Sequence, residues 1–335
     1  MKKLFLIIIL ISVFNIKAQH TFSIVAVDST TGEIGSAGAT CGDSIIWPGT
    51  PGAFLISDVL PGVGAIHSQA WYLATNQNNA RFRMQQGDNP EEIINWLINN
   101  DIQGNPSMRQ YGIIDFNNGN PRSAGYTGSN CDNYKNHVLG PNYAIQGNIL
   151  LGQEILDSME YYFNNTNGCI ADRIMAAMQG ANVIGADTRC MSEGTSSLSS
   201  FIRVAQPSDN YNDLYLDINI AGTASGIEPI DELQIKYNQW KQNNNACDTN
   251  FTYLEISKKN TKLLYPNPAN DFISIEIETN ENNFHNHYKI FDSTGKIINN
   301  GKIDINEKKI KIEQLNNGLY YLKINGETFR FIKRQ

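Results

Sequence analysis

The feature that most constrains the fold is a pair of uncharged segments joined by a short turn near the start of the chain. Over residues 21–28 the side chains alternate in character as they do in a strand, and residues 29–32 have the composition of a turn. Residues 33–40 are predicted to form a second strand, rich in Gly and Ala. Small side chains in a strand let another backbone or a ligand approach closely. Neither strand carries a charge in its interior, so burial on both faces is tolerable. We therefore predict that the Thr21 strand is central in a sheet and pairs with the Glu33 strand.

Helix and strand signals alternate from there to about residue 237. Asn89 and Pro90, followed by two Glu residues, form a strong helix start, and apolar spacing predicts further helices over residues 150–163 and 170–178. Further strands are expected at residues 62–70, 110–116, 143–147, 196–205 and 213–218. This order predicts an α+β fold, compatible with two antiparallel sheets covered by helices.

The composition changes at residue 240. Residues 240–262 are polar and lack periodicity, which is typical of a linker. Residues 263–335 then carry only short strand signals separated by Gly and Asn turns, which predicts a small all-β sandwich. We place the main domain at residues 20–239.

The first nineteen residues have the pattern of a signal peptide. Lys2 and Lys3 precede an apolar run over residues 4–14, and Ala18 is a small residue suited to cleavage. A run of about eleven apolar residues is too short to cross a membrane, which needs about twenty. We expect export to the periplasm and a secreted or cell-surface protein without a membrane span.

Charge and motifs exclude several classes of function. The net charge of −7 and the absence of a basic cluster argue against a nucleic-acid partner. No Walker or dinucleotide glycine motif indicates a nucleotide cofactor. His285 and His287 could share one face of a strand, but without a third ligand we favour exposed polar surface over metal binding. We expect neither metal nor cofactor.

Five cysteines are spread over the chain without CxxC spacing, which makes a structural zinc site improbable. In an oxidising compartment up to two disulfides are expected, with one cysteine left over and the pairing open. A catalytic cysteine is the weaker hypothesis. The cysteines are Cys41, Cys131, Cys169, Cys190 and Cys247.

Two regions resemble known families. The phrases LYPNPA from Leu264, YKIFDSTGK from Tyr288 and NGLYYLKI from Asn317 closely resemble the type A C-terminal sorting domain of type IX secretion. This resemblance implies that the tail is an address read by the type IX secretion machinery and often removed afterwards. A carbohydrate-binding β module is the competing interpretation.

The main domain resembles the domain-of-unknown-function 1028 family. The matching phrases are TFSIVA from Thr21, PGVGA from Pro61, RQYGIID from Arg109, GYTGSNC from Gly125 and YAIQGNIL from Tyr143. The resemblance implies the four-layer αββα sandwich of N-terminal-nucleophile (Ntn) hydrolases, and it implies less about activity.

That fold directs attention to Thr21. An Ntn enzyme attacks an amide carbonyl with the side chain of its first mature residue, whose α-amine, with a pKa of about 8, takes the proton. The simpler alternative is a β-branched residue that begins a strand. Cleavage after Ala18 leaves Gln19 and His20 ahead of Thr21, so the nucleophile role requires further trimming; we disfavour His20 as a base.

Other polar residues are candidates for the same site. Asn148 suits an oxyanion donor, with a turn or helix cap as the equal alternative. Asp187 and Arg189 could orient a substrate carboxylate, although an ion pair with each other is favoured. Ser68 and Gln69 end a strand and are expected to line the same cleft.

The leading hypothesis is a secreted, cofactor-free amide-bond hydrolase of the Ntn type, acting on a small amide or peptide-like substrate. The alternative is a non-catalytic secreted or surface-associated binding module on the same scaffold, and a purely structural surface protein is a third possibility. The mature N-terminus would discriminate the first two.

Overall fold

The structure is a computed structural model that describes residues 21–45, 49–117, 119–247, 264–265, 267–275, 287–292, 295–303, 308–324 and 327–334. The predicted signal peptide, most of the predicted linker and His285 lie outside these residues. Below, residues 21–247 are termed the main domain and residues 264–334 the C-terminal module. Among the described residues, no helix is both long and apolar enough to cross a membrane.

The main domain contains two antiparallel sheets. The six-stranded sheet has the spatial order β10 (Leu216–Ile220), β9 (Ser199–Ala205), β2 (Ile34–Thr40), β1 (Thr21–Val27), β8 (Tyr143–Gly147) and β7 (Asn136–Gly140). The four-stranded sheet has the order β3 (Ser57–Leu60), β4 (Gly64–Ala70), β5 (Arg109–Asn117) and β6 (Asn120–Thr127). The predicted hairpin is confirmed: β1 lies inside its sheet, pairs Thr21 with Thr40, and is fully buried.

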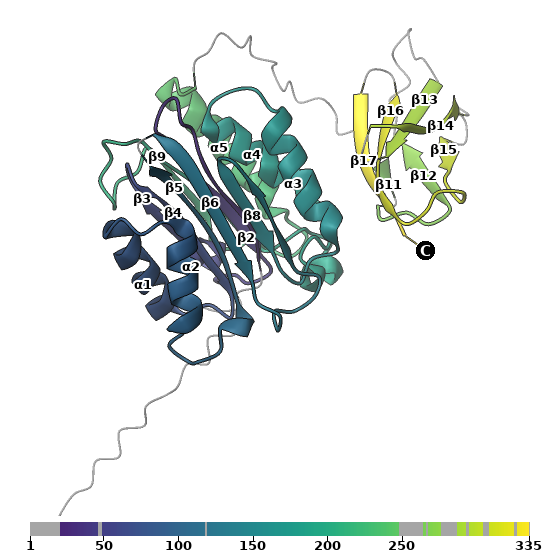
Figure 1. The fold of residues 1–335 in the computed structure, drawn as a ribbon. Helices are drawn as coiled ribbons and strands as arrows, with labels where there is room; N and C mark the ends of the chain where they lie inside the picture. Colours follow the sequence, from purple (N-terminus) through teal and green to yellow (C-terminus); the bar gives the residue numbers. More distant parts are fainter. Residues whose placement is uncertain are drawn as a thin grey trace, which may run out of the picture.

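Helices cover the outer face of each sheet (Figure 1). The four-stranded sheet packs on α1 (Ala74–Gln85) and α2 (Pro90–Asn99). The six-stranded sheet packs on α3 (Gln153–Asn165), α4 (Ile170–Gly180) and α5 (Pro229–Asn244). Short 3₁₀ turns are η1 (Gly52–Ile56), η2 (Pro106–Met108) and η3 (Thr188–Glu193). The mixed α+β class predicted from the sequence is therefore observed.

Small residues and caps place these elements as the sequence indicated. A Cβ added to Gly35 would come within 3.0 Å of Ile174, so the glycine lets α4 lie close to β2. The helix start at residue 89 is a capping box, in which Asn89 and Glu92 exchange side-chain and backbone hydrogen bonds.

The linker was predicted to begin at residue 240, but the first of these residues belong to a helix. Helix α5 continues to Asn244, and Tyr237 stacks on Trp240 within it. Most of the helix surface is polar, so its few buried residues were not recognised as a helical stripe. Helix α1, which also lacks an apolar stripe, was missed for the same reason.

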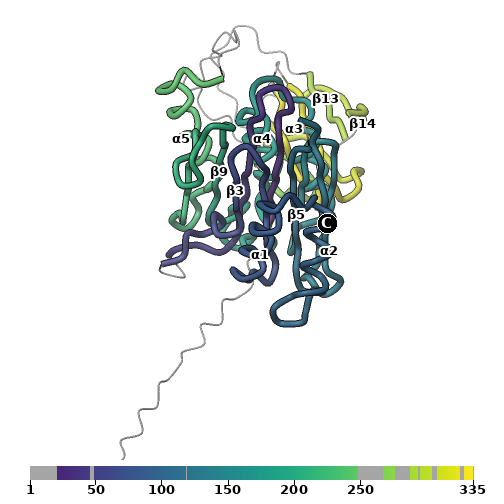
Figure 2. The backbone as a smooth tube through the Cα atoms, turned by 60° about the vertical axis from the view of Figure 1, so that its left-hand side comes forward, coloured from purple at the N-terminus to yellow at the C-terminus, as the bar shows by residue number. Residues whose placement is uncertain are grey.

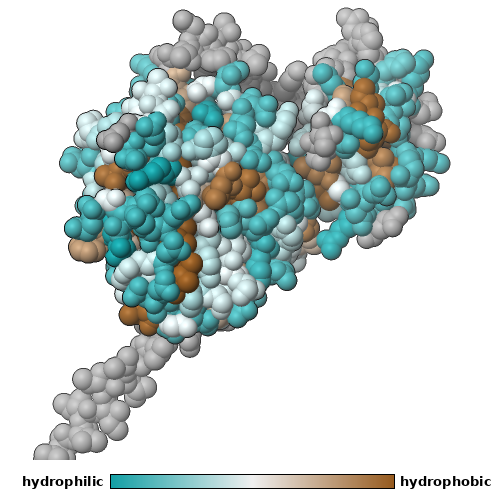
Figure 3. Space-filling view, in the orientation of Figure 1, coloured by the Kyte–Doolittle hydropathy of each residue, from teal (hydrophilic) through white to brown (hydrophobic). Residues whose placement is uncertain are grey.

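The elements described beyond residue 263 are strands. They form a three-stranded sheet of β11 (Leu264–Tyr265), β12 (Phe272–Ile275) and β15 (Lys309–Lys311). The four-stranded sheet contains β14 (Ile297–Lys302), β13 (His287–Asp292), β16 (Gly318–Ile324) and β17 (Glu327–Lys333). The sheets share an apolar core, and the module lies beside α3 and α4 in both backbone views (Figures 1 and 2). On the face seen in Figure 3, hydrophobic residues form separate small groups.

Candidate functional site

A polar hydrogen-bond network fills one end of the space between the two sheets of the main domain. We define this polar end by the buried residues that face the opposite sheet there, and their side chains are connected across it. Ser23 Oγ donates to Gln69 Oε1 at 2.6 Å, and Gln146 Nε2 donates to Ser23 Oγ at 2.6 Å. The residues are Thr21, Ser23, His67, Gln69, Gln110, Gln146 and Asn148.

Thr21 begins β1 at this polar end and contacts two of the other predicted site residues. Its carbonyl oxygen accepts the backbone N–H of Asn148 at 3.1 Å and Nε2 of Gln69 at 3.2 Å. Thr21 and Asn148 are both fully buried. The structure therefore brings Thr21, Asn148 and Gln69 together.

Gln110 holds the side chains of Gln69 and Asn148 in one orientation. Its Oε1 accepts Nε2 of Gln69 and Nδ2 of Asn148, each at 2.8 Å. Its own Nε2 donates to the carbonyl of Gly147 at 2.8 Å and to Thr127 Oγ1 at 2.9 Å. A buried amide with this many partners is fixed in place.

Two residues of the polar end are followed by unusual backbone. Ile149, directly after Asn148, has φ 55°, and Ala70, directly after Gln69, has φ 66°. Such angles are costly for residues with a Cβ, most of all a β-branched one, and they cluster at functional sites. These strained positions therefore direct attention to the adjoining amides.

His67 connects the polar end to the middle of the inter-sheet space. Its Nδ1 accepts Nε2 of Gln146 at 3.1 Å, which leaves Nε2–H to donate to Ser36 Oγ at 2.7 Å. Burial, with repulsion from Arg203, lowers the pKa of His67 to about 3. The imidazole is therefore neutral at pH 7.

Asp187 and Arg189 lie beside Thr40, the strand partner of Thr21. Asp187 accepts the backbone N–H of Cys41 and is paired in two-pronged fashion with Arg189, at 2.9 and 2.6 Å. Arg189 also donates to Thr40 Oγ1 at 3.3 Å. The Arg189 side chain is 29% exposed whereas that of Asp187 is buried, so Arg189 is the member of the pair that solvent reaches.

A disulfide holds this loop against the sheet. Cys41 follows β2 and bonds to Cys190, which follows Arg189, while the second disulfide joins Cys169 to Cys247. Cys131 is the remaining cysteine, and burial raises the pKa of its thiol to about 11. A thiol with that pKa is a poor nucleophile at pH 7.

Ser68 does not belong to the polar end, contrary to the prediction. Successive side chains of a strand point to opposite faces. Since Gln69 faces β1, Ser68 faces the layer of α1 and α2, next to its strand partner Tyr111. The sequence indicated the correct strand end, but it did not specify which of the neighbouring residues Ser68 and Gln69 faces the inter-sheet space.

The sequence analysis missed Ser23, His67, Gln110 and Gln146. One signal was present: each is a polar residue inside a strand whose other residues are mainly apolar or small. Ordinary strands place such residues toward solvent, so the signal acquires meaning only once burial on both faces is known.

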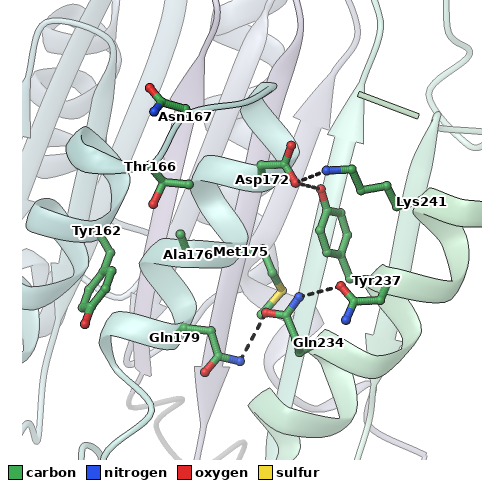
Figure 4. A pocket seen from close by; sticks show the side chains of 11 residues that line it. Tyr162, Thr166, Asn167, Asp172, Met175, Ala176, Gln179, Gln234, Tyr237 and Lys241 are labelled. Atoms are coloured by element: carbon green, nitrogen blue, oxygen red, sulfur yellow. Dashed lines mark hydrogen bonds and ion pairs between the residues drawn. The ribbon is translucent and has the colours of Figure 1, made fainter. Parts of the chain in front are cut away.

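A separate cavity of about 400 Å³ lies on the outer face of the helices (Figure 4). It is lined by α3, α4 and α5, with Asp172 paired to Lys241 at 2.6 Å and bonded to Tyr237 at 2.9 Å. Asp172 also lies near Cys169 and Cys247, but both sulfurs are used in the disulfide and cannot hold a metal ion. This cavity, termed the outer cavity below, is remote from the polar end, because the six-stranded sheet lies between them.

Comparisons with known proteins match both parts of the chain. Residues 21–233 match the family described as "Family of unknown function (DUF1028)", and residues 263–335 match the "Secretion system C-terminal sorting domain". A crystal structure of a Silicibacter pomeroyi protein of the first family is similar, with a TM-score of 0.53 and 22% identity. That match covers 66% of this chain and 89% of the other, and at this identity it concerns the fold alone. Among curated proteins, none is significantly similar.

Proposed function

The chain belongs to the DUF1028 family, and from that premise we propose that its main domain is a secreted amide-bond hydrolase of the Ntn type, with Thr21 as the nucleophile. In this proposal the two helix-covered sheets are the αββα sandwich of Ntn hydrolases. The sorting domain indicates export and a cell-surface or secreted location. We further propose that residues 1–19 are a signal peptide for passage into the periplasm.

One observation carries the catalytic proposal. The backbone carbonyl of Thr21, at the start of a central strand, accepts the backbone N–H of Asn148, whose side chain is oriented by Gln110. A nucleophile and an oxyanion donor must flank the same carbonyl group, each at about 3 Å, so they must share one site. The strained backbone at Ile149 adds support, because strain of this kind concentrates at functional sites.

The proposed reaction needs only protein groups. Thr21 Oγ1 attacks the amide carbon while the α-amine of Thr21 accepts the hydroxyl proton. The Asn148 side chain donates to the oxyanion, and the α-ammonium then protonates the departing amine as the C–N bond breaks. Water hydrolyses the resulting ester and regenerates Thr21. Arg189 would orient a carboxylate on the substrate.

The test compares chains that begin at different residues. A chain starting at Thr21, confirmed by intact mass, should hydrolyse members of a panel of N-acyl amino acids and short peptides. A chain starting at Gln19 should not, because a peptide nitrogen cannot act as the base. Thr21→Ala should reduce turnover by at least about a thousandfold, and Thr31→Ala, at an exposed turn, should not. Equal activity of the Gln19 and Thr21 chains would exclude this mechanism.

A non-catalytic binding module remains the second candidate. The full burial of both Thr21 and Asn148 favours it, because a substrate must reach a nucleophile. If the Thr21 chain binds members of the same panel without turnover, and Thr21→Ala binds them equally, the binding function is supported instead.

A further inference from the structure

The C-terminal module contacts the main domain through one face of its four-stranded sheet. Leu319 of β16 and Ile332 of β17 are direct strand partners, only 7% and 6% exposed, and both join the apolar cluster of the main domain. In Figure 1, β16 and β17 lie on the side of the module that faces α3. This contact involves neither the polar end nor the proposed chemistry.

Between Leu319 and Leu322, both faces of β16 carry apolar or aromatic residues, which is unusual for a sheet with a solvated side. Tyr320, Leu322 and Ile324 point into the core of the module, whereas Leu319 and Tyr321 point toward the main domain. A strand with one solvated face alternates apolar and polar residues, so apolar residues on both faces indicate two-sided burial. The sequence of the tail thus carries residues for a partner surface.

Polar contacts specify where the module lies. Arg330 donates from one guanidinium nitrogen to the carbonyls of Gln179 and Gly180, at 2.9 and 2.8 Å. These carbonyls end α4, where a cation is favoured by the helix dipole. Tyr321, the strand partner of Arg330, packs against the apolar cluster of the main domain, and burial raises its pKa to about 12.

We propose that the face of β16 and β17 formed by Leu319, Tyr321, Arg330 and Ile332 is a docking surface for the chain's own main domain, with Arg330 as its latch. The docked partner is the α3–α4 surface, and the module is held there until it is released or removed. Because Gln179, whose carbonyl Arg330 contacts, also lines the outer cavity, the docked module lies beside that cavity. Release would uncover that side of it.

Hydrogen exchange on the purified full chain tests the proposal. Arg330→Ala should raise exchange of α3, α4 and residues 318–333 by about tenfold through loss of charge-assisted hydrogen bonds. Lys323→Ala is the matched control, since Lys323 is exposed on the same face of the neighbouring strand β16, and this variant should exchange as the wild type does. Wild-type exchange of α3 and α4 in Arg330→Ala would overturn the latch.

A second variant separates undocking from unfolding of the module. Leu319→Lys adds a charge to the docking face and leaves the opposite, core-facing side of β16 unchanged. We expect faster exchange in α3 and α4 and a larger radius of gyration, with unchanged exchange in β12 and β13. Wild-type dimensions and α3–α4 exchange in this variant would overturn the docking surface itself.

Discussion

The two ends of the space between the sheets of the main domain differ sharply, although the same strands supply both. Toward the far end of β1, Val25 and Val27 replace Thr21 and Ser23 on the same face. We term this the apolar end, and all its residues are buried. They are Val25, Val27, Ile34, Val59, Ala65, Ile114, Ala144 and Ala205.

This difference indicates that the apolar end stabilises the fold, whereas the polar end has another role. Apolar burial stabilises by about 25 cal/mol per Å². A buried polar group instead costs free energy unless its hydrogen bonds are made, and a complete network returns little net stability. A polar end placed opposite an apolar one is therefore poorly explained by stability alone. The polar end is instead consistent with a functional site.

The largest effect is expected from the disulfide beside the polar end. Replacing Cys41 and Cys190 together by Ser should cost about 5 kcal/mol of unfolding free energy, because the bond closes a loop spanning 149 residues. Urea unfolding measures this. The matched pair, Cys169 and Cys247, spans 78 residues and should cost about 0.6 kcal/mol less. Only the first replacement should also reduce turnover. Equal losses of turnover in the two variants would contradict a special role for the disulfide beside the polar end.

Cavity formation at the apolar end should come next. Ile114→Ala should destabilise the chain by about 3 kcal/mol, because the fully buried site cannot collapse completely. Activity at low denaturant should be retained. Ile298→Ala, at a 37% exposed position, is the control and should stay within about 0.5 kcal/mol of wild type. A loss of turnover in folded Ile114→Ala would show that the apolar end also serves the site.

The polar end should respond mainly in rate. Asn148→Ala in the chain beginning at Thr21 should lower kcat/KM by about a hundredfold, the effect of losing an oxyanion donor. Steady-state kinetics on the substrate identified for that chain measures this. Asn99→Ala, at an exposed helix end, should leave the rate unchanged. Wild-type kinetics in Asn148→Ala would remove the oxyanion role.

The smallest effect concerns His67 and pH. Its folded pKa of about 3 lies below its ordinary value of 6.5, so only the unfolded chain gains the proton in between. The stability from keeping His67 neutral is complete above pH 6.5 and is lost as pH falls toward 3. At pH 5 the loss should be about 2 kcal/mol. His67→Gln should flatten this slope relative to His287→Gln, an exposed control; a wild-type slope would contradict the assignment.

Much of the fold followed from local patterns. The β1–β2 hairpin and the capped start of α2 were predicted because turn composition, small residues and capping chemistry act over a few neighbouring residues. Helices α1 and α5 were missed because they bury only a narrow stripe. Such helices are stabilised mainly by packing against sheet residues that are distant in the sequence, and local propensity does not report that packing.

The site divides in the same way. Thr21, Gln69 and Asn148 were chosen from sequence and meet in the structure, whereas Ser68 points to the other face of β4. Gln110 and Gln146 were missed, since their hydrogen-bond partners are distant in sequence or belong to the other sheet. Whether the polar end catalyses amide hydrolysis stays a prediction.

The sequence by itself determined the α+β class, the central hairpin, membership of the DUF1028 family and the match of residues 263–335 to a sorting domain. These depend on local propensity and on short sequence motifs. Tertiary structure alone decided which cysteines pair and which amides meet Thr21. It also decided that β16 has two buried faces. Each of these depends on packing between residues far apart in the chain, and strand periodicity specifies a face without naming what covers it.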